Sequence, residues 1–223
     1  CTDKTGTLTE NRMKVAALAV GDASAPHLFK INGESLPENF HGLVEHAILA
    51  SAPEPFDPME VAFHALGHTW LSDSEHLHPE WDLVQTYPLS PALRAMSHVW
   101  RSRGADAHIV STKGAPEAVM NLCHLSPELQ AQWGEVVHAM ASEGLRVLAV
   151  AQGRFVGDAW PSSAHDFDFE WVGLVGLSDP LRAEIPQAIA DCHSASIKVI
   201  MITGDYPQTA RVIANQAGLP HGD

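Results

Sequence analysis

The chain has 223 residues, of which 45% are hydrophobic and 18% are charged, a composition typical of a globular protein rather than a disordered one. Its 13 basic and 27 acidic residues give a formal net charge of −14 at pH 7, which argues against nucleic acid or an anionic membrane surface as the main partner. No lysine or arginine lies between Lys30 and Arg94, so an anionic ligand must be held by basic residues elsewhere.

The first half of the chain predicts helices between short strands. Residues 1–14 are polar and turn-rich, and the apolar run 15–20 predicts a strand. Residues 39–51 carry apolar side chains at helical spacing, and the string DPME at 57–60 predicts the start of a helix that runs to about Trp70. Three further strands are predicted at 83–86, 98–101 and 108–111.

The second half predicts an alternation of strands and helices. A helix is expected to begin after Ser126 and to end at Gly144. The apolar runs 146–151 and 171–177 predict buried strands, followed by a helix over 183–194, a strand over 198–202 and a helix over 207–217. This order from residue 171 onward predicts a parallel unit with a right-handed crossover. The expected fold class is therefore α/β, a parallel unit interrupted by a large mixed α+β insert.

Residues 3–9, which spell DKTGTLT, are the first candidate for chemistry. An aspartate followed by hydroxyl side chains and a glycine can present its carboxylate beside backbone N–H groups that bind phosphate. Such an aspartate can also accept a phosphoryl group covalently. The alternative is a polar turn at the end of the chain, although the complete string is far more specific than a bare Asp-x-Thr.

This string resembles the phosphorylation signature of P-type cation-transporting ATPases, which belong to the haloacid-dehalogenase-like superfamily with its parallel Rossmannoid fold. Four further segments are similar to family motifs in the same order: PLSPALRAMS at 88–97 to the adenine-pocket segment PFSSERKRMS, KGAPE at 113–117, DPLR at 179–182 to the hinge motif DPPR, and TGD at 203–205. The KGAPE and DPLR strings favour the calcium-pump-like subgroup over the heavy-metal subgroup.

The resemblance implies an ATP-driven cation pump in which Asp3 attacks the γ-phosphorus of ATP and becomes an aspartyl phosphate. Thr5 and Thr203 would hydrogen-bond the transferred phosphoryl group, Lys4 would add supporting charge, and Mg²⁺ would be bound at Asp3 and Thr5. Soluble phosphatases of the superfamily carry a second Asp where this chain has Thr5, which disfavours that alternative. A non-catalytic nucleotide-binding module is a further alternative.

The resemblance also implies a nucleotide-binding set, which comprises Glu60, Leu89, Arg94, Lys113, Gly114, Arg146, Asp179, Arg182, Gly204 and Asp205. Some members have structural alternatives: Arg146 as a surface arginine, Glu60 as part of a capping box, and Lys113 as a turn residue before glycine. Leu89 takes the place of the family's adenine-stacking Phe, so weak nucleotide affinity is expected, with Tyr87 as the alternative stacking residue. The binding cleft is expected to be a positive exception on an acidic surface, formed by Arg94, Lys113 and Arg146.

The resemblance implies an incomplete phosphorylation domain at residues 1–13 and 172–223 and a nucleotide-binding domain at residues 14–171. The chain would be the cytoplasmic portion of an integral membrane protein, whose transmembrane helices and actuator domain are absent from this sequence, as is the family's GDGxND motif. By itself it is expected to bind Mg²⁺ poorly and to bind nucleotide without being phosphorylated. For His64, His68, His76 and His78, a transition-metal site and solvated side chains are the two interpretations.

Overall fold

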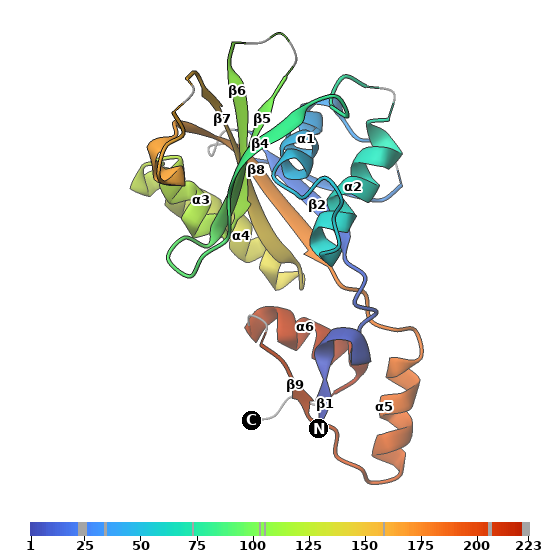
Figure 1. Cartoon of the computed structure of the whole chain (residues 1–223). Helices are drawn as coiled ribbons and strands as arrows, with labels where there is room; N and C mark the ends of the chain where they lie inside the picture. The colour runs from blue at the N-terminus through green and yellow to red at the C-terminus, as the bar shows by residue number, and fades with distance from the viewer. Residues whose placement is uncertain are drawn as a thin grey trace.

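The computed structural model describes residues 1–21, 26–33, 35–72, 74–102, 104, 106–157, 159–204 and 207–219, with Gln208 described by its backbone alone. Asp205, one of the predicted site residues, lies outside this description. The chain forms two lobes (Figure 1). The large lobe comprises residues 14–178 and the small lobe comprises residues 1–9 and 181–219, and two extended segments of the chain join them.

A seven-stranded sheet forms the centre of the large lobe. Its order is β3-β2-β8-β7-β6-β5-β4, and every neighbouring pair of strands is antiparallel. The strands are β2 (Lys14–Val20), β3 (His27–Lys30), β4 (Asp82–Tyr87), β5 (Ala95–Arg101), β6 (His108–Gly114), β7 (Arg146–Phe155) and β8 (Phe169–Ser178).

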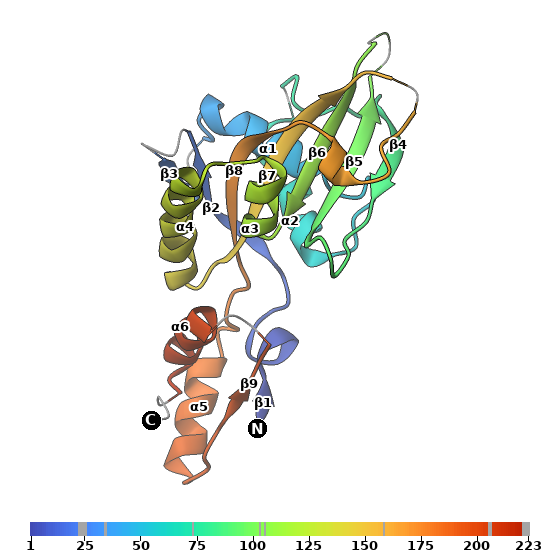
Figure 2. The same ribbon diagram turned by 90° about the vertical axis from the view of Figure 1, so that its left-hand side faces the viewer.

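Helices cover both faces of this sheet (Figures 1 and 2). The first face carries the short helix η2 (Glu38–Phe40), α1 (His41–Leu49) and α2 (Pro58–Trp70), and the second face carries α3 (Pro116–Leu122) and α4 (Pro127–Ser142). A further short helix, η3 (Ala164–Asp166), lies in the β7–β8 connection. The sheet therefore separates two apolar cores, one under each pair of helices.

The starts of the two long helices follow from local sequence. The Asp57 side chain accepts hydrogen bonds from the backbone N–H groups of Met59 (2.9 Å) and Glu60 (3.4 Å), and Ser126 caps α4 by accepting from Leu129 N–H. Gly144, which follows α4, has a φ of 86°, a conformation that favours glycine. The predicted starts of α2 and α4 and the predicted end of α4 are therefore confirmed.

The predicted parallel orientation of residues 171–177 is wrong. They belong to β8, which lies antiparallel between β2 and β7 in the large lobe. The near-continuous apolar run is typical of parallel strands because helices usually bury both faces of a parallel sheet. Here both faces of an antiparallel sheet are buried, with Leu174 in one core and Val175 in the other. Strand β8 also spans the division proposed between residues 171 and 172, which stays a prediction.

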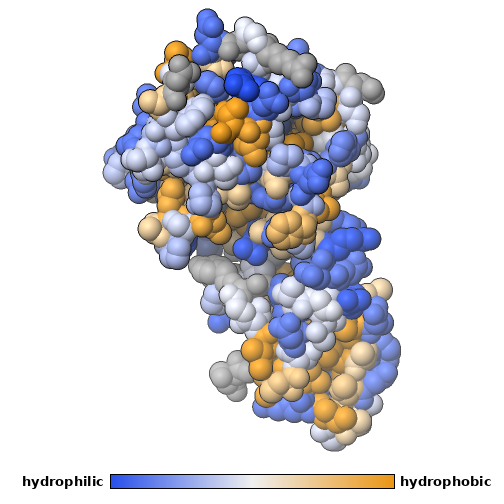
Figure 3. All heavy atoms as spheres, in the orientation of Figure 1, coloured by the Kyte–Doolittle hydropathy of each residue, from blue (hydrophilic) through white to orange (hydrophobic). Residues whose placement is uncertain are grey.

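The small lobe contains the only parallel pairing among the described residues, between β1 (Thr2–Asp3) and β9 (Met201–Ile202). Strand β9 is shorter than the predicted 198–202, and α5 (Ile185–Ser194) begins two residues later than predicted, whereas α6 (Pro207–Ala217) agrees with the prediction. Leu8, Ile189, Ala217 and Leu219 form the buried core of this lobe. In Figure 3 the visible face of the small lobe carries more orange, hydrophobic residues for its size than the visible face of the large lobe.

The overall class, a mixed α/β fold with a large helix-covered insert, is confirmed. Strand β3 and helix α3 were not predicted, because each is short and carries no regular apolar periodicity. In the part of the chain that the structure describes, no helix combines the length and the apolar character needed to cross a membrane.

Candidate functional site

A cavity of about 890 Å³ is lined by residues of both lobes. The small lobe contributes Lys4 and Thr5 from the DKTGTLT string, together with Gly204, Thr209 and Ile213, and Asp179 comes from a connecting segment. The large lobe contributes the first turn of α2, the starts of α3 and β7, and the end of α4. Its described lining residues include Asp57, Pro58, Met59, Arg94, Ala115, Pro116, Glu117, His138, Ala141 and Arg146.

The loop that carries Thr5 is held by a side chain of the small lobe, Arg182. Thr5 and Gly6 have non-helical backbone angles inside the turn η1 (Lys4–Leu8), and the φ of Gly6 is 79°. Arg182 donates from Nη2 to the carbonyl of Gly6 (2.9 Å) and from Nε to the carbonyl of Thr9 (3.1 Å). Arg182, predicted to contact nucleotide, is thus bonded to the backbone of the DKTGTLT loop.

Asp179 also contacts this loop. Its carboxylate accepts a 2.5 Å hydrogen bond from the Thr9 hydroxyl and a 3.3 Å bond from the Arg12 backbone N–H, and the Lys4 ammonium lies 3.9 Å away. Lys4, Thr9 and Asp179 are all buried. Asp179 thus joins the DKTGTLT loop to the segment that connects the lobes.

Asp3 and Thr203 are brought to the same edge of the small parallel sheet. Asp3 is the last residue of β1 and pairs in register with Ile202, the last residue of β9, so Thr203 follows directly at the neighbouring strand end. Ligands of open parallel sheets bind at this edge. Asp3 is exposed and Thr203 is half-buried, and neither is among the described residues that line the cavity.

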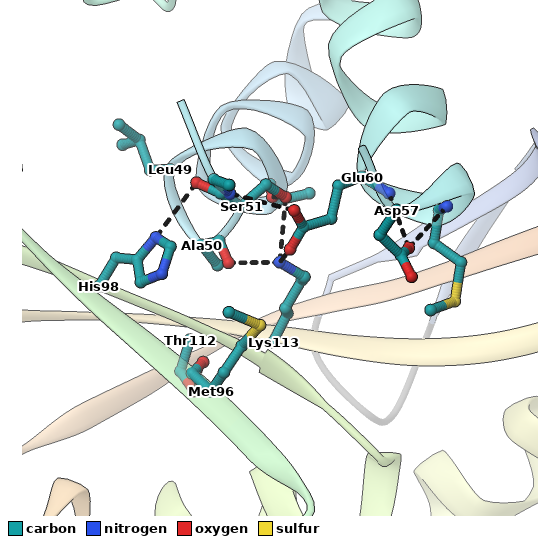
Figure 4. A network of polar contacts seen from close by, with 12 residues as sticks. Leu49, Ala50, Ser51, Asp57, Glu60, Met96, His98, Thr112 and Lys113 are labelled. Carbon is teal, nitrogen blue, oxygen red and sulfur yellow. Dashed lines mark hydrogen bonds and ion pairs between the residues drawn. The ribbon is translucent and has the colours of Figure 1, made fainter. Parts of the chain in front are cut away.

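Lys113 and Glu60 form a buried ion pair behind the cavity wall (Figure 4). The Lys113 ammonium donates to a Glu60 carboxylate oxygen at 2.7 Å, to the Ser51 hydroxyl at 3.0 Å and to the backbone carbonyl of Ala50. The second Glu60 oxygen accepts from the backbone N–H of Ala52 at 3.2 Å. Glu60 therefore does not close a capping box with Asp57, although it lies in the predicted position for one.

Within this pair, each side chain opposes the unfavourable effect of burial on the charged form of the other. Burial alone would raise the pKa of Glu60, but the hydrogen bond and charge of Lys113 outweigh it and hold that pKa below its usual value. Burial lowers the pKa of Lys113, while the contact with Glu60 opposes that shift. Each side chain therefore favours the charged form of its partner.

The cavity wall is charge-balanced rather than positive. Among its described residues the cations are Lys4, Arg94 and Arg146, and the carboxylates are Asp57, Glu117 and Asp179. Arg94 is also paired with Glu117 at 2.7 Å, and Lys113 is not among the described lining residues. The expected positive cleft of Arg94, Lys113 and Arg146 is therefore wrong in its simple form. In the sequence, Glu117 was recognised only as the last residue of KGAPE, and Asp57 only as the start of a helix.

The predicted base-stacking residues lie apart from the cavity wall. Leu89 is 65% exposed in the β4–β5 connection and is not among the described lining residues. Tyr87 donates its hydroxyl to the carbonyl of Pro161 at 2.7 Å and packs edge-on against Phe167, with ring centroids 5.3 Å apart. Burial raises the pKa of Tyr87. The Tyr87 ring is therefore engaged with the β7–β8 connection.

Two of the four histidines considered for metal binding share a carboxylate instead. His76 and His78 contact opposite oxygens of Glu45 at 2.6 and 2.7 Å, and the His78 ring stacks on Trp81 at 3.7 Å. Within the described ranges, no group of three or more His, Cys, Asp or Glu side chains is arranged to hold a metal ion. The Mg²⁺ expected at Asp3 and Thr5 stays a prediction, because Mg²⁺ is usually bound through one or two carboxylates together with waters and substrate phosphates.

Three neutral histidines predict a pH dependence of the large lobe's stability. Burial lowers the pKa values of His46, His64 and His98 from 6.5, so below that pH the unfolded chain takes up protons that the folded chain excludes. The free energy of unfolding is expected to fall by about 1 kcal/mol per pH unit for each such histidine as the pH drops through 6. Urea unfolding between pH 7.5 and 5.5 measures this slope. The variant His98→Gln should reduce the slope and His27→Gln, at an exposed position on β3, should not; a flat wild-type profile contradicts the expectation.

Comparison with known proteins gives a family match over residues 56–184, to the model described as P-type ATPase, cytoplasmic domain N. The chain is 33% identical over 245 residues to "Probable cation-transporting ATPase I" of Mycobacterium leprae, an alignment that covers 98% of the chain and 14% of that relative. It is 28% identical over 253 residues to a calcium-transporting ATPase of Bacillus subtilis, covering 98% of the chain and 28% of the relative. A sodium/potassium exporting P-type ATPase of Schizosaccharomyces pombe is 33% identical over 173 residues, or 73% of the chain and 17% of the relative. The chain therefore spans less than a third of the length of each of these relatives.

Proposed function

The chain belongs to the P-type cation-transporting ATPase family, and we propose that its cavity binds ATP for phosphoryl transfer to Asp3. The supporting observation is that a single cavity of about 890 Å³ is lined by Lys4 and Thr5 of the DKTGTLT loop and by Arg94 and Arg146 of the large lobe. This volume is within the range of about 300–1,000 Å³ that is typical of ligand pockets.

In the proposed reaction, the Asp3 carboxylate oxygen attacks the γ-phosphorus of ATP. A new O–P bond forms, the bond from the γ-phosphorus to the bridging β–γ oxygen breaks, and ADP leaves with that electron pair. Thr5 and Thr203 would donate hydrogen bonds to the transferred group, and the Lys4 and Arg146 charges would balance the phosphates. Gly204 leaves room beside the strand end, because a Cβ there would meet no atom of the described residues beyond its chain neighbours within 4 Å.

We also propose that the aspartyl phosphate serves ion transport in a complete membrane-bound pump, with the remaining parts of that pump as the partners of this chain. The family membership supports this step, and the nature of the cation is left to the membrane part, where ion ligands of such proteins lie. Cytoplasmic location and a role for Mg²⁺ belong to the same proposal. The chain by itself is proposed to bind nucleotide without being phosphorylated.

Arginine replacement on β7 tests the nucleotide site. Arg146→Ala is expected to weaken ATP binding at least tenfold, because a charge-assisted contact with phosphate contributes about 1.5–3 kcal/mol. Arg154→Ala is the matched control, since Arg154 is also exposed on β7 but lies outside the described cavity wall. Isothermal titration of both variants with ATP measures the difference. Equal affinities for Arg146→Ala and the wild-type chain would rule out this cavity as the phosphate site.

A further inference from the structure

The backbone at the end of α4, in the large lobe, contacts a side chain of α6, in the small lobe. A Cβ at Gly144 would lie 2.8 Å from Cγ1 and 3.1 Å from Cβ of Val212, so the Val212 side chain rests directly on the glycine backbone. Gly144 has a φ of 86°, a conformation that favours glycine, and Val212 is half-buried. A side chain at position 144 would separate the two helices, and its absence allows them to touch.

Two further residues show that α4 and α6 share an interface. Ala141 on α4 is 9% exposed, Ile213 on α6 is 7% exposed, and both line the cavity. Neither belongs to the apolar cores of the lobes, so their burial is explained by the meeting of the two helices. Among the described elements, α4 and α6 make the most extensive contact between the lobes, and α6 lies next to the end of α4 in both views (Figures 1 and 2).

Both sides of this contact are stiff. The Gly144 N–H donates to the carbonyl of Ala141 at 2.9 Å. The Leu145 N–H donates to the carbonyl of Met140 at 3.3 Å, and Met140 is part of the large lobe's core. On the other side, a β-branched valine in a helix is restricted mainly to one side-chain rotamer. Neither side can yield without a movement of the backbone, so the contact limits how closely the two lobes approach each other.

The contact lies close in the chain to residues of the proposed phosphate site. Gly144 precedes Arg146 by two residues, and both line the cavity. The small lobe, to which α6 belongs, contributes Lys4 and Thr5 of the DKTGTLT loop to the same cavity wall. The approach of α4 to α6 therefore affects how far Arg146 lies from that loop.

We propose that Val212 is a positioning residue for the phosphoryl transfer: its contact with Gly144 sets the arrangement of the two lobes, and with it the distance between Arg146 and the DKTGTLT loop. Val212 is not among the described residues of the cavity wall, so it acts through α4 rather than by touching the nucleotide. The inference rests on the proposed function for its effect on ATP, whereas its effect on the lobes is independent of ATP.

Residual dipolar couplings of the backbone amides, recorded by NMR without ATP, measure how the lobes are oriented. One alignment tensor is expected to fit both lobes of the wild-type chain. In Val212→Phe the larger side chain pushes α6 away from Gly144 and turns the small lobe about the connecting segments, so each lobe is expected to need its own tensor. Gln216→Phe adds the same ring at an exposed position of α6 and is expected to keep the common tensor. Separate tensors in the wild type, or the wild-type tensor in Val212→Phe, overturn the proposal.

The affinity for ATP separates positioning from a role in packing alone. Val212→Phe is expected to weaken ATP binding about tenfold or more, because a nucleotide bound to one lobe is then misplaced for the other. Val212→Thr keeps the branched shape at this half-buried position and is expected to retain the common tensor and an ATP affinity within about twofold of the wild-type value. Isothermal titration measures both affinities. Displaced lobes in Val212→Phe with an unchanged affinity would contradict the positioning role.

Val212→Ala keeps the test decisive if Val212→Phe fails to fold. It removes the contact without adding bulk, so the couplings of the small lobe are expected to depart from the wild-type tensor, and couplings that match the wild type overturn the proposal. If the wild-type chain binds no ATP at all, the proposed function is wrong, while the couplings still decide whether Val212 sets the arrangement of the lobes.

Discussion

Replacing Phe63 by alanine is expected to lower the free energy of unfolding by about 3–5 kcal/mol. Phe63 is 1% exposed and is the largest fully buried side chain among the described residues, in the core between α2 and the sheet. Removing the ring loses its burial and leaves a cavity that the surrounding helices and strands fill only in part. Urea unfolding followed by circular dichroism measures the change.

Val61 provides the matched control for this prediction. It lies on the same helix but is 45% exposed, so Val61→Ala is expected to change the free energy of unfolding by less than about 0.5 kcal/mol. A loss at Phe63 no larger than the loss at Val61 would mean that α2 does not pack on the sheet as described. The same helix carries Asp57 and Met59 into the cavity wall, so its packing matters for the site as well.

Replacing Gly114 by alanine is expected to destabilise the large lobe by about 3 kcal/mol. A Cβ at Gly114 would overlap the backbone carbonyl of Arg94 and the Cα of Ala95, and backbone atoms in a paired strand cannot move aside cheaply. The close approach of β6 to β5 is therefore a structural reason for the glycine of KGAPE, whose predicted contact with nucleotide stays a prediction. The change is measured by thermal or urea unfolding.

Gly134 is the glycine that shows the opposite behaviour. It lies within α4, where a Cβ would meet no atom of the described residues within 4 Å apart from the adjacent helix backbone, so Gly134→Ala is expected to stabilise the chain by about 0.5–1 kcal/mol. The two substitutions add the same methyl group and differ only in surroundings. If both variants changed stability in the same direction, the tight packing of Gly114 against Arg94 and Ala95 would be contradicted.

Features that depend on neighbouring residues were predictable from the sequence. The start of α2 follows from Asp57 and the proline after it, and the start of α4 follows from Ser126, because helix caps involve residues two or three positions apart. The spatial proximity of Asp3 and Thr203 was predictable from the motifs and from the apolar strand before Thr203. The structure adds the register that places them at one sheet edge.

Features that depend on distant partners were not predictable. The antiparallel direction of β8 was missed because burial on both faces gives the same apolar run in either orientation. The surroundings of Lys113 were missed because its partners Glu60 and Ala50 are 53 and 63 residues away in the chain. The balanced charge of the cavity was missed because the nearby carboxylates Asp57 and Glu117 had been assigned no place in it.

The excess of acidic residues in the whole chain is compatible with a polyanionic ligand, because the cavity wall does not share that excess. The cavity wall has as many described cations as carboxylates, within a chain whose net charge is −14. The wall is therefore far less negative than the average surface, and Arg146 is free of any ion pair within 4 Å among the described residues, unlike Arg94. Substituting Arg146 is accordingly expected to change the affinity for phosphate most.

The most direct test of the shared ATP site is an NMR titration of the ¹⁵N-labelled chain with ATP. The account predicts that amide signals of Lys4 and Thr5 in the small lobe and of Met59 and Arg94 in the large lobe move together, with one common dissociation constant, since one ligand would contact both lobes. Signals that move in only one lobe, or in two lobes with different dissociation constants, would contradict a single ATP site between them.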